Sequence, residues 1–316
     1  MNSIQWQGNA MWFTLPEDGG KNYLETRLLM LKLHSTSLRN GLKEVLNSVN
    51  EELVIASPYI KTSEAEWVCD ELERRRPPGS VRLQVLTDVR SANVLSGSLD
   101  IEALNLFSSR VPASVVVNLP RLHAKVYVAD CACALITSAN LTPSGMDFNF
   151  EFGVEFHDSA FVGNVKRDLE SYSRLGNVLS RQSLAELQLV ANELSSEFQR
   201  VQKSAASSLK RRFSEKLRAA NHQFLRAQVG TRSAHSLFSE AILYALAATP
   251  LSTVELHPKV QKLLPDLCDD SVELVINGQQ FGKRWKHAVR NAQQYLKRGG
   301  QIVFDGKRWS LASLHR

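Results

Sequence analysis

Short apolar runs rich in β-branched residues alternate with helical segments over residues 53–173, and this alternation limits the possible folds more than any other feature. Strands are expected at 53–60, 81–89, 113–119, 123–130, 134–139 and 150–157, and helices at 64–76, 99–108 and 160–173. Strands that alternate with helices in this way are typical of an α/β domain, in which helices flank a sheet. The pattern predicts such a domain over residues 1–178.

A long helical pattern follows the predicted α/β domain. Over residues 181–228 apolar positions recur at steps of three and four, which predicts one long helix or two helices in series. A softer stretch, SAASS at 204–208, separates the two parts. We therefore expect a helical linker at 179–230, which packs on the first domain or supports pairing with a second subunit.

The remaining segment, 231–316, has the outline of a third domain. The predicted helices are 235–249, 257–266 and 281–300. A β-hairpin is expected at 301–312 because Asp305-Gly306 lies between two apolar runs, and this dipeptide is a strong hairpin signal. Three helices followed by a hairpin predict a winged helix.

Charge is distributed unevenly along the chain. Residues 201–316 hold 19 basic and 8 acidic residues, a net charge of +11, whereas residues 1–200 carry −5. A basic third beside a slightly acidic body indicates a polyanion-binding module joined to a second function, although a solvated basic surface has the same composition.

Several classes of protein do not fit the sequence. No apolar run approaches the roughly 20 residues of a membrane span, and the first residues lack the pattern of a signal peptide. The four cysteines have no paired CxxC spacing, so we expect neither a disulfide framework nor a zinc knuckle. These features predict a cytoplasmic protein with no membrane association, no cofactor and no metal.

A histidine and a lysine stand two residues apart in the predicted strand at 123–130. Because side chains alternate along a strand, His123 and Lys125 should share one face. An imidazole can attack phosphorus and an ammonium can neutralise phosphate oxygens, so the pair suits a phosphodiester. An ordinary strand histidine beside a solvated lysine would give the same two letters. A second such pair, His257 and Lys259, has no matching residues after it and is interpreted as surface chemistry on a helix.

More polar residues follow His123 at fixed spacing. Asp130 ends the predicted strand, where its carboxylate can hold the following loop. Ser138 and Asn140 then offer a hydroxyl and an amide, which can donate to phosphate oxygens without adding charge.

The pattern H-x-K-x4-D followed by T-S-x-N resembles the HKD motif of the phospholipase D superfamily. Thr137 stands where that family usually has glycine. Asn149-Phe150-Glu151 is similar to the Asn-x-Glu of the family's nuclease branch, and this resemblance implies that Glu151 holds the imidazole of His123. The implied fold is a phospholipase D-like mixed sheet flanked by helices. The implied catalytic residues are His123, Lys125, Asp130, Ser138, Asn140 and Glu151.

Only one such motif is present, yet phosphodiester cleavage needs both a nucleophile and an acid for the leaving oxygen. The two oxygens concerned lie on opposite sides of phosphorus, so one histidine cannot serve both. We therefore expect a homodimer through the nuclease domain, in which one His123 attacks and the other donates a proton. Family members with one motif are similar in forming such dimers.

The basic residues near the C-terminus indicate which phosphodiester is cleaved. A basic helix followed by a basic hairpin suits the groove and backbone of DNA. The candidate DNA-binding residues are Lys283, Arg284, Lys286, Arg290, Lys307 and Arg308. A winged helix with incidental lysines that binds protein is the alternative. Residues 285–311 resemble the winged helix attached to Mrr-type restriction proteins.

The combined features resemble metal-independent restriction endonucleases of the phospholipase D superfamily. We therefore expect a DNA endonuclease that acts in prokaryotic restriction or phage defence, with defence-system proteins as further partners. Two alternatives stay open: a phospholipid phosphodiesterase, and a DNA-binding regulator whose HKD fold does not cut because Thr137 replaces glycine.

Overall fold

The computed structural model describes residues 4–7, 10–14, 28–35, 37–77, 79–203, 213, 216–217, 220, 233–265, 267–276 and 279–312. The chain divides into two compact units, residues 1–228 and 229–316. Most of the predicted linker beyond residue 203, including 204–208, lies outside the described residues. The existence of a separate linker domain at 179–230 therefore stays a prediction.

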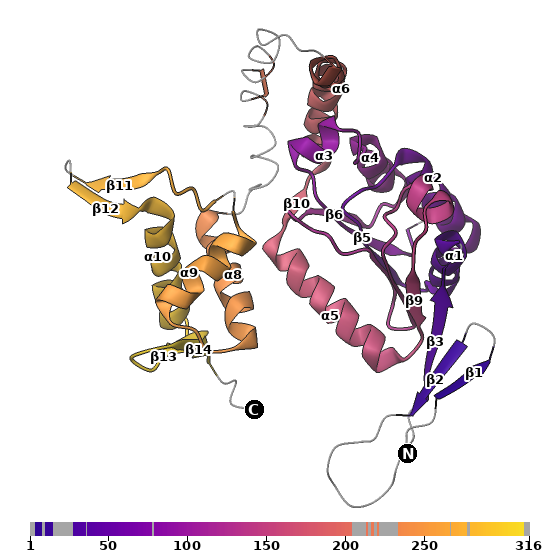
Figure 1. Cartoon of the computed structure of the whole chain (residues 1–316), viewed down its shortest axis with the longest axis horizontal. Coiled ribbons are helices and arrows are strands. Elements are labelled where there is room, and N and C mark those ends of the chain that lie inside the picture. The colour runs from indigo at the N-terminus through magenta and orange to yellow at the C-terminus, as the bar shows by residue number, and fades with distance from the viewer. Residues whose placement is uncertain are drawn as a thin grey trace, which may run out of the picture. The chain divides into compact units, whose positions relative to one another are not determined.

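Ten strands of the described residues form one mixed sheet in the first unit, confirming the predicted α/β class (Figure 1). In spatial order the strands are β1 (Ile4–Gln7), β2 (Ala10–Thr14), β3 (Leu28–His34), β9 (Gly153–Phe156), β8 (Cys133–Thr137), β7 (Val126–Ala129), β4 (Glu52–Ala56), β5 (Arg82–Thr87), β6 (Ser114–Asn118) and β10 (Asn177–Leu179). Only the central strands β4, β5 and β6 run parallel to one another. All other neighbouring pairs are antiparallel.

Helices cover both faces of this sheet. The larger core lies beneath α1 (Leu38–Ser48), α2 (Thr62–Arg75), α4 (Ile101–Arg110) and α6 (Arg181–Lys203). On the opposite face α5 (Ser159–Leu175) contributes Val162 and Leu169 to a second core. Two short helical segments complete the unit, α3 (Ser91–Leu95) and the π-helix η1 (Ser144–Phe148).

Strand β4 shows why the sequence produces three layers. Leu53 and Ile55 are buried in the larger core, whereas Val54 and Ala56 are buried in the second core. A strand that is covered on both faces needs an uninterrupted apolar run, because alternate residues point to opposite sides. The run LVIA therefore marks a central strand, and β4 agrees with that position because it pairs on both sides, with β5 in parallel and with β7 antiparallel.

One predicted strand begins later than expected. The sequence predicts a strand over 123–130, but β7 begins at Val126, so His123 and Lys125 precede it. The preceding segment turns instead of pairing: the Leu122 N–H donates to the Leu119 carbonyl, and Arg121 has a φ of +67°. Strands β1, β2, β3 and β10 and helix α1 were not predicted, since the sequence analysis placed no element there.

The second unit contains three helices and two hairpins among its described residues. The helices are α8 (Ala234–Ala248), α9 (Thr253–Leu263) and α10 (Arg284–Arg298), and the hairpins are β11 (Glu273–Ile276) with β12 (Gln279–Lys283), and β13 (Ile302–Phe304) with β14 (Trp309–Leu311). Leu251, between α8 and α9, forms an antiparallel bridge with Trp309. The hairpin predicted around Asp305-Gly306 is present, and Gly306 supplies the positive φ of +99° that its turn needs.

Two predictions in this unit were wrong in detail. The helix expected from residue 281 begins at Arg284, because residues 279–283 pair with β11 as a strand. His257 lies on α9 as expected, but it is buried against Trp285 and is not a surface residue. Burial lowers the pKa of His257 to about 4, and the charges of Arg290 and Lys286 act in the same direction.

A buried carboxylate lies away from the predicted site, on β9. Each oxygen of Glu155 accepts a hydrogen bond, one from His34 and one from His157, both at 2.7 Å. Burial opposes its ionisation, but the bonds from His157 and His34 outweigh burial and lower the pKa of Glu155 to about 2. Cys133 lies within 4.8 Å of the ligand atoms of Glu155 and His157. The carboxylate is fully hydrogen-bonded by the two histidines, so this cluster is explained as a buried polar network.

Among the described residues, no helix combines the length and the apolar character needed to cross a bilayer.

Candidate active site

With the exception of Asp130, the predicted catalytic residues lie at one end of the central strands. His123 and Lys125 lie in the segment between β6 and β7, and Val126 pairs with Ala56 at the carboxyl end of β4. Ser138 directly follows β8, whose last residue, Thr137, pairs with Gly153. Ligands in open α/β sheets bind outside the carboxyl ends of the parallel strands, and this is the edge that the motif occupies.

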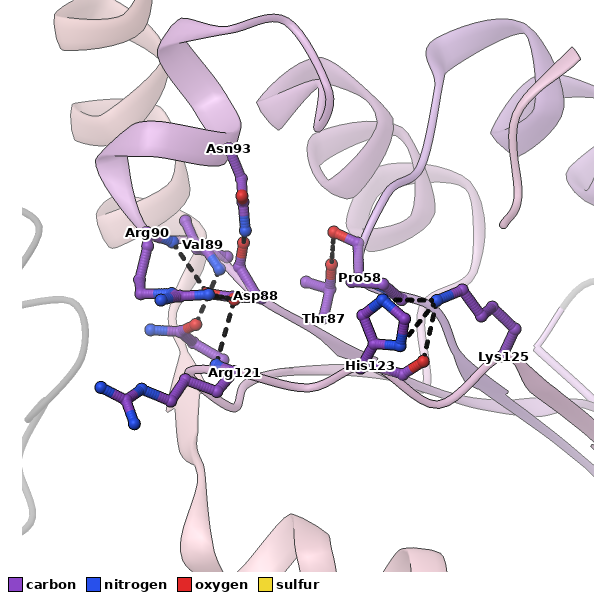
Figure 2. A network of polar contacts seen from close by, with 10 residues as sticks. Pro58, Thr87, Asp88, Val89, Arg90, Asn93, Arg121, His123 and Lys125 are labelled. Carbon is purple, nitrogen blue, oxygen red and sulfur yellow. Dashed lines mark hydrogen bonds and ion pairs between the residues drawn. The ribbon is translucent and has the colours of Figure 1, made fainter. Parts of the chain in front are cut away.

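The lysine of the motif contacts the histidine directly (Figure 2). Lys125 Nζ lies 3.2 Å from His123 Nδ1 and 3.3 Å from Nε2, and it donates to the His123 carbonyl oxygen at 2.9 Å. Lys125 is only 8% exposed, whereas His123 is exposed. Burial lowers the pKa of Lys125, and the Glu151 carboxylate acts in the opposite direction. A reachable imidazole beside a buried ammonium gives a nucleophile and a phosphate-binding charge in one place.

The aspartate of the motif holds the loop that leads into the central strand β4. Asp130 accepts hydrogen bonds from the backbone N–H groups of residues 50, 51 and 52 at 2.7, 3.0 and 2.7 Å. Its position, with a φ of +52°, corrects the expectation that this carboxylate holds the loop after it. Asp130 therefore connects β7 to the start of β4, and its contribution to the site is to position β7, the strand that follows the histidine.

The hydroxyl residues of the motif fix the segment that carries the glutamate. Thr137 Oγ1 donates to the Phe152 carbonyl at 2.8 Å, and the Phe152 N–H donates to Ser138 Oγ at 3.0 Å. Ser138 Oγ also forms a short hydrogen bond to Glu151, whose other oxygen accepts from Asn149 Nδ2 at 3.1 Å. The partners of Glu151 are thus Ser138 and Asn149 among the described residues, which departs from the implied bond to the imidazole. Thr137 has a structural use that glycine would lack.

The loop after Ser138 is held by hydrogen bonds to two buried residues. Tyr127 donates to the Ala139 carbonyl at 3.1 Å, and Ser57 Oγ accepts from the Leu141 N–H at 3.0 Å. Asn140 is half-buried, and its buried Oδ1 has no hydrogen-bond partner among the described residues. A Cβ on Gly145 would lie 2.5 Å from the Asn140 carbonyl oxygen, so only glycine permits this packing. Neither Ser57 nor Tyr127 was predicted as a supporting residue.

An arginine holds η1, the segment that leads to Glu151. Arg39 donates to both oxygens of Asp147 and to Glu64, and its guanidinium stacks 4.7 Å from the centre of the Trp67 ring. The side-chain hydrogen bond to Asp147 raises the pKa of Arg39, and Glu64 acts in the same direction. The position of Glu151 is therefore fixed from both sides, by Arg39 before it and by Ser138 across from it.

A second polar network lies beside the motif and was missed by the sequence analysis (Figure 2). The buried carboxylate of Asp88 accepts from the Arg90 side chain and from the Arg121 N–H. Asn118 Oδ1 accepts from the Val89 N–H at 2.8 Å, and Asn93 donates to the Asp88 carbonyl at 3.0 Å. Apart from the acidic residue after an apolar run, the sequence carries no signal for this network, because its members come from separate segments.

Three exposed phenylalanines surround the glutamate. Phe148, Phe150 and Phe152 are 78%, 106% and 56% exposed. Exposed apolar side chains that gather on one segment mark contact with another molecule more often than singly scattered ones do. The rim of the candidate site is therefore apolar on the side of Glu151.

The predicted DNA-binding residues are distributed over three elements of the second unit. Arg284, Lys286 and Arg290 lie on α10, whose opposite side buries Trp285, Val289 and Leu296. Lys283 lies on β12 and forms an ion pair with Glu273 at 2.5 Å, which corrects its expected place on the helix. Lys307 and Arg308 lie in the turn of the β13–β14 hairpin, and Arg308 approaches Glu255 at 3.4 Å. Their role in binding DNA stays a prediction.

Sequence comparison finds relatives for the segment that holds the motif. A family model described as cardiolipin synthase, phospholipase D-like domain, matches residues 42–173. Cardiolipin synthase 1 of Bacillus cereus is 25% identical over 137 residues, which cover 42% of this chain and 26% of that relative. Cardiolipin synthase 1 of Bacillus anthracis matches with the same identity and coverage. The chain thus spans about a quarter of the length of these curated relatives.

Structural comparison finds similar chains of low sequence identity. The phospholipase D family member Nuc from Salmonella typhimurium is 14% identical, with a TM-score of 0.39 over 47% of this chain and 97% of that one. Phosphatidylserine synthase from Haemophilus influenzae is 17% identical, with a TM-score of 0.44 over 65% of this chain and 49% of that one.

Proposed function

We propose that the phospholipase D-like domain formed by residues 42–173 is a nuclease that cleaves DNA phosphodiesters through a covalent phosphohistidine. The observation that carries the proposal is the contact of Lys125 with the exposed imidazole of His123, beside the Ser138–Glu151 pair. A phosphodiester placed there would meet a nucleophile, a cation for its non-bridging oxygens and a hydroxyl.

The proposed reaction has two steps with the same geometry. An imidazole nitrogen of His123 attacks phosphorus, an N–P bond forms, and the leaving oxygen takes a proton as its P–O bond breaks. Water then attacks the phosphohistidine, an O–P bond forms and the N–P bond breaks, which releases His123. The group that donated a proton in the first step is now deprotonated and accepts the proton from this water. Lys125 neutralises charge that builds on the non-bridging oxygens in both steps.

The acid that protonates the leaving oxygen is His123 of a second chain in this proposal. The chain holds one motif of this kind, and the attacking and leaving oxygens occupy opposite sides of phosphorus. A two-fold symmetric dimer places two identical imidazoles face to face. The exposed Phe148, Phe150 and Phe152 support this proposal, because apolar side chains at the rim of a site are suited to burial between subunits.

DNA is proposed as the substrate because of the second unit. Its three helices and its β13–β14 hairpin have the order of a winged helix, and Leu251 pairs with Trp309 where such a domain has its first strand. α10 buries one face and presents Arg284 and Arg290 on the other. A basic helix with a basic wing suits the groove and backbone of a duplex. The biological setting we propose is prokaryotic restriction or phage defence in the cytoplasm, together with other defence proteins.

Replacing Arg284 and Arg290 by alanine should weaken DNA binding and reduce its salt dependence. Each phosphate contact that is lost lowers the slope of log affinity against log salt by about 0.9, so the double variant should lose a slope of about 2. Fluorescence anisotropy with a duplex at several salt concentrations measures the slope. Arg82→Ala, at an exposed arginine on β5 of the first unit, is the matched control. An unchanged slope in the double variant would show that these two arginines of α10 do not contact DNA phosphates.

A phospholipid phosphodiesterase is the second candidate, and the phenylalanines around Glu151 favour it. Apolar aromatic side chains beside a catalytic site can enter a lipid surface and bring a headgroup phosphate to the histidine. The cardiolipin synthases that match this chain agree with that substrate class. A third candidate is a regulator that binds DNA without cutting it. In this case the second unit would bind DNA and His123 would not be catalytic.

Incubation of the full chain in EDTA with plasmid DNA and, separately, with phosphatidylglycerol liposomes tests the proposal. We expect plasmid cleavage to persist in EDTA, because every group in the proposed steps is a side chain or water. Gel electrophoresis and thin-layer chromatography measure the two products. Liposome turnover without plasmid cleavage would establish the lipid substrate, whereas no turnover with intact DNA binding would establish the regulator. Strict dependence on Mg²⁺ would contradict the proposed chemistry.

A further inference from the structure

We propose that Arg121 forms a second phosphate-binding subsite beside His123, which holds a non-scissile phosphate of the same nucleic acid strand. This inference rests on the proposed nuclease function. Arg121 lies outside the motif. Such a subsite would allow the first unit itself to bind a polymer with repeated phosphates in preference to a single phosphodiester.

The backbone of Arg121 has a conformation that is costly for this residue. Its φ of +67° lies in the left-handed region, which glycine adopts readily and a residue with a Cβ does not. The turn is held in place by the Arg121 N–H, which donates to Asp88 at 3.0 Å, and by the Leu122 N–H, which donates to Leu119 at 3.1 Å. Glycine would satisfy both bonds at lower cost. The strained turn therefore carries an arginine where glycine would be less costly, and such outliers gather at functional sites.

The charge of Arg121 is not neutralised by the network that holds its backbone. Asp88 is 1% exposed, and its carboxylate accepts three hydrogen bonds from the Arg90 side chain. Arg90 Nε donates to both carboxylate oxygens, and a terminal guanidinium nitrogen donates to one of them. That pair balances one negative charge with one positive charge. The Arg121 guanidinium is exposed, and no hydrogen bond or ion pair to it is found among the described residues. It therefore adds a positive charge to the surface beside His123.

The position of Arg121 relative to His123 suits a second phosphate. Two residues of chain span at most roughly 7 Å, so Arg121 and His123 are neighbours on one loop. In Figure 2 the Arg121 side chain extends away from the imidazole, while Lys125 turns toward it. A phosphate bound by Arg121 is therefore a different phosphate from the one that His123 attacks. An arginine guanidinium binds phosphate through two parallel hydrogen bonds, which suits a contact that fixes the register of a strand.

The test compares short thymidine oligonucleotides that carry one, two or three internucleotide phosphates as inhibitors of bis(p-nitrophenyl) phosphate hydrolysis by the full chain. In the wild type, the inhibition constant should fall by about tenfold for the first oligonucleotide long enough to place a phosphate at Arg121. In Arg121→Gly this gain should disappear, although the backbone strain is relieved and the melting temperature is equal or higher. Arg121→Lys should retain part of the gain. Arg82→Ala, an exposed arginine at the amino end of β5, is the matched control and should keep all of it.

Binding of a fluorescent trinucleotide to His123→Ala, with and without Arg121→Gly, gives the same comparison without turnover. Equal affinities, or an undiminished gain in Arg121→Gly, would overturn the subsite while the nuclease proposal stands. Absence of DNA hydrolysis together with Arg121-dependent oligonucleotide binding would overturn the proposed activity and leave the subsite. An equal gain from a bilayer that displays single phosphates would overturn the preference for a nucleic acid strand.

Discussion

His123→Ala should lower the rate of phosphodiester hydrolysis by about 10⁴-fold or more, since removal of a nucleophile leaves only the contribution of binding and charge. The side chain is exposed, so the substitution removes no buried contact and the fold should be retained. Initial rates with plasmid DNA and with bis(p-nitrophenyl) phosphate measure the effect. DNA binding should be unchanged, because the proposed DNA contacts of the second unit are intact.

His287→Ala is the matched control for this variant. His287 is a partly exposed histidine on α10, where it is hydrogen-bonded to the Phe281 carbonyl at 2.6 Å. Its replacement should leave hydrolysis of the small diester at the wild-type rate. Residual activity of His123→Ala above a few per cent would show that another residue is the nucleophile.

The same variant tests whether two chains share the site. When wild-type and His123→Ala chains are exchanged at equal amounts, a site that needs both imidazoles should retain about one quarter of the activity, whereas independent sites would retain about one half. Activity that follows the wild-type fraction linearly would contradict the shared site. Native mass spectrometry of the mixture confirms the exchange, because the mixed dimer has a mass between those of the two homodimers.

Lys125→Ala should lower the turnover rate by about 10²- to 10³-fold, the usual cost of removing one group that stabilises transition-state charge. The ammonium lies beside both imidazole nitrogens, and the residue is only 8% exposed, so water cannot replace the charge effectively. Single-turnover rates separate this loss from a change in substrate binding. Lys259→Ala is the control, because Lys259 is the exposed lysine of the second H-x-K sequence, on α9.

The pH dependence gives a second readout of Lys125. Burial lowers its pKa below the ordinary lysine value, so the catalytic ammonium should lose its proton, and activity should fall, at a lower pH than an exposed lysine would give. Lys125→Arg should remove this alkaline decline, although the larger guanidinium should not restore the full rate in a buried space. An alkaline limb that is the same in both proteins would assign it to a different group.

The sequence was sufficient to predict the α/β class and the motif, for a local physical reason. Strands β4, β5 and β6 contribute residues to the cores on both faces, and their apolar runs, such as LVIA in β4 and VVV in β6, can be recognised without neighbours. The spacing of His123, Lys125, Asp130, Ser138 and Asn140 is also local, since all five lie within 18 consecutive positions. One hairpin, β7–β8, brings Lys125 close to Ser138 at its open end, whereas Asp130 lies at its turn.

The parts that were wrong or missed depend on contacts between distant segments. The strand boundary at Val126 is set by the turn at Arg121, and that turn depends on Asp88, 33 residues earlier in the chain. Glu151 bonds to Ser138, which lies 13 residues earlier in the chain. The start of α10 at Arg284 is set by the pairing of β12 with β11. None of these partners can be read from spacing, because each is brought into place by the sheet or by a hairpin.

The sequence by itself therefore determined the layers of the first domain and the local spacing of His123 and Lys125, because apolar periodicity and motif spacing act within a few residues. Only the tertiary structure decided that Asp130 anchors the start of β4, that Asp88 is balanced by Arg90, and that Arg121 keeps its charge beside the imidazole. The physical reason is that hydrogen bonds to a buried carboxylate are chosen by which donors the fold brings within about 3 Å, and the chain order does not contain that information.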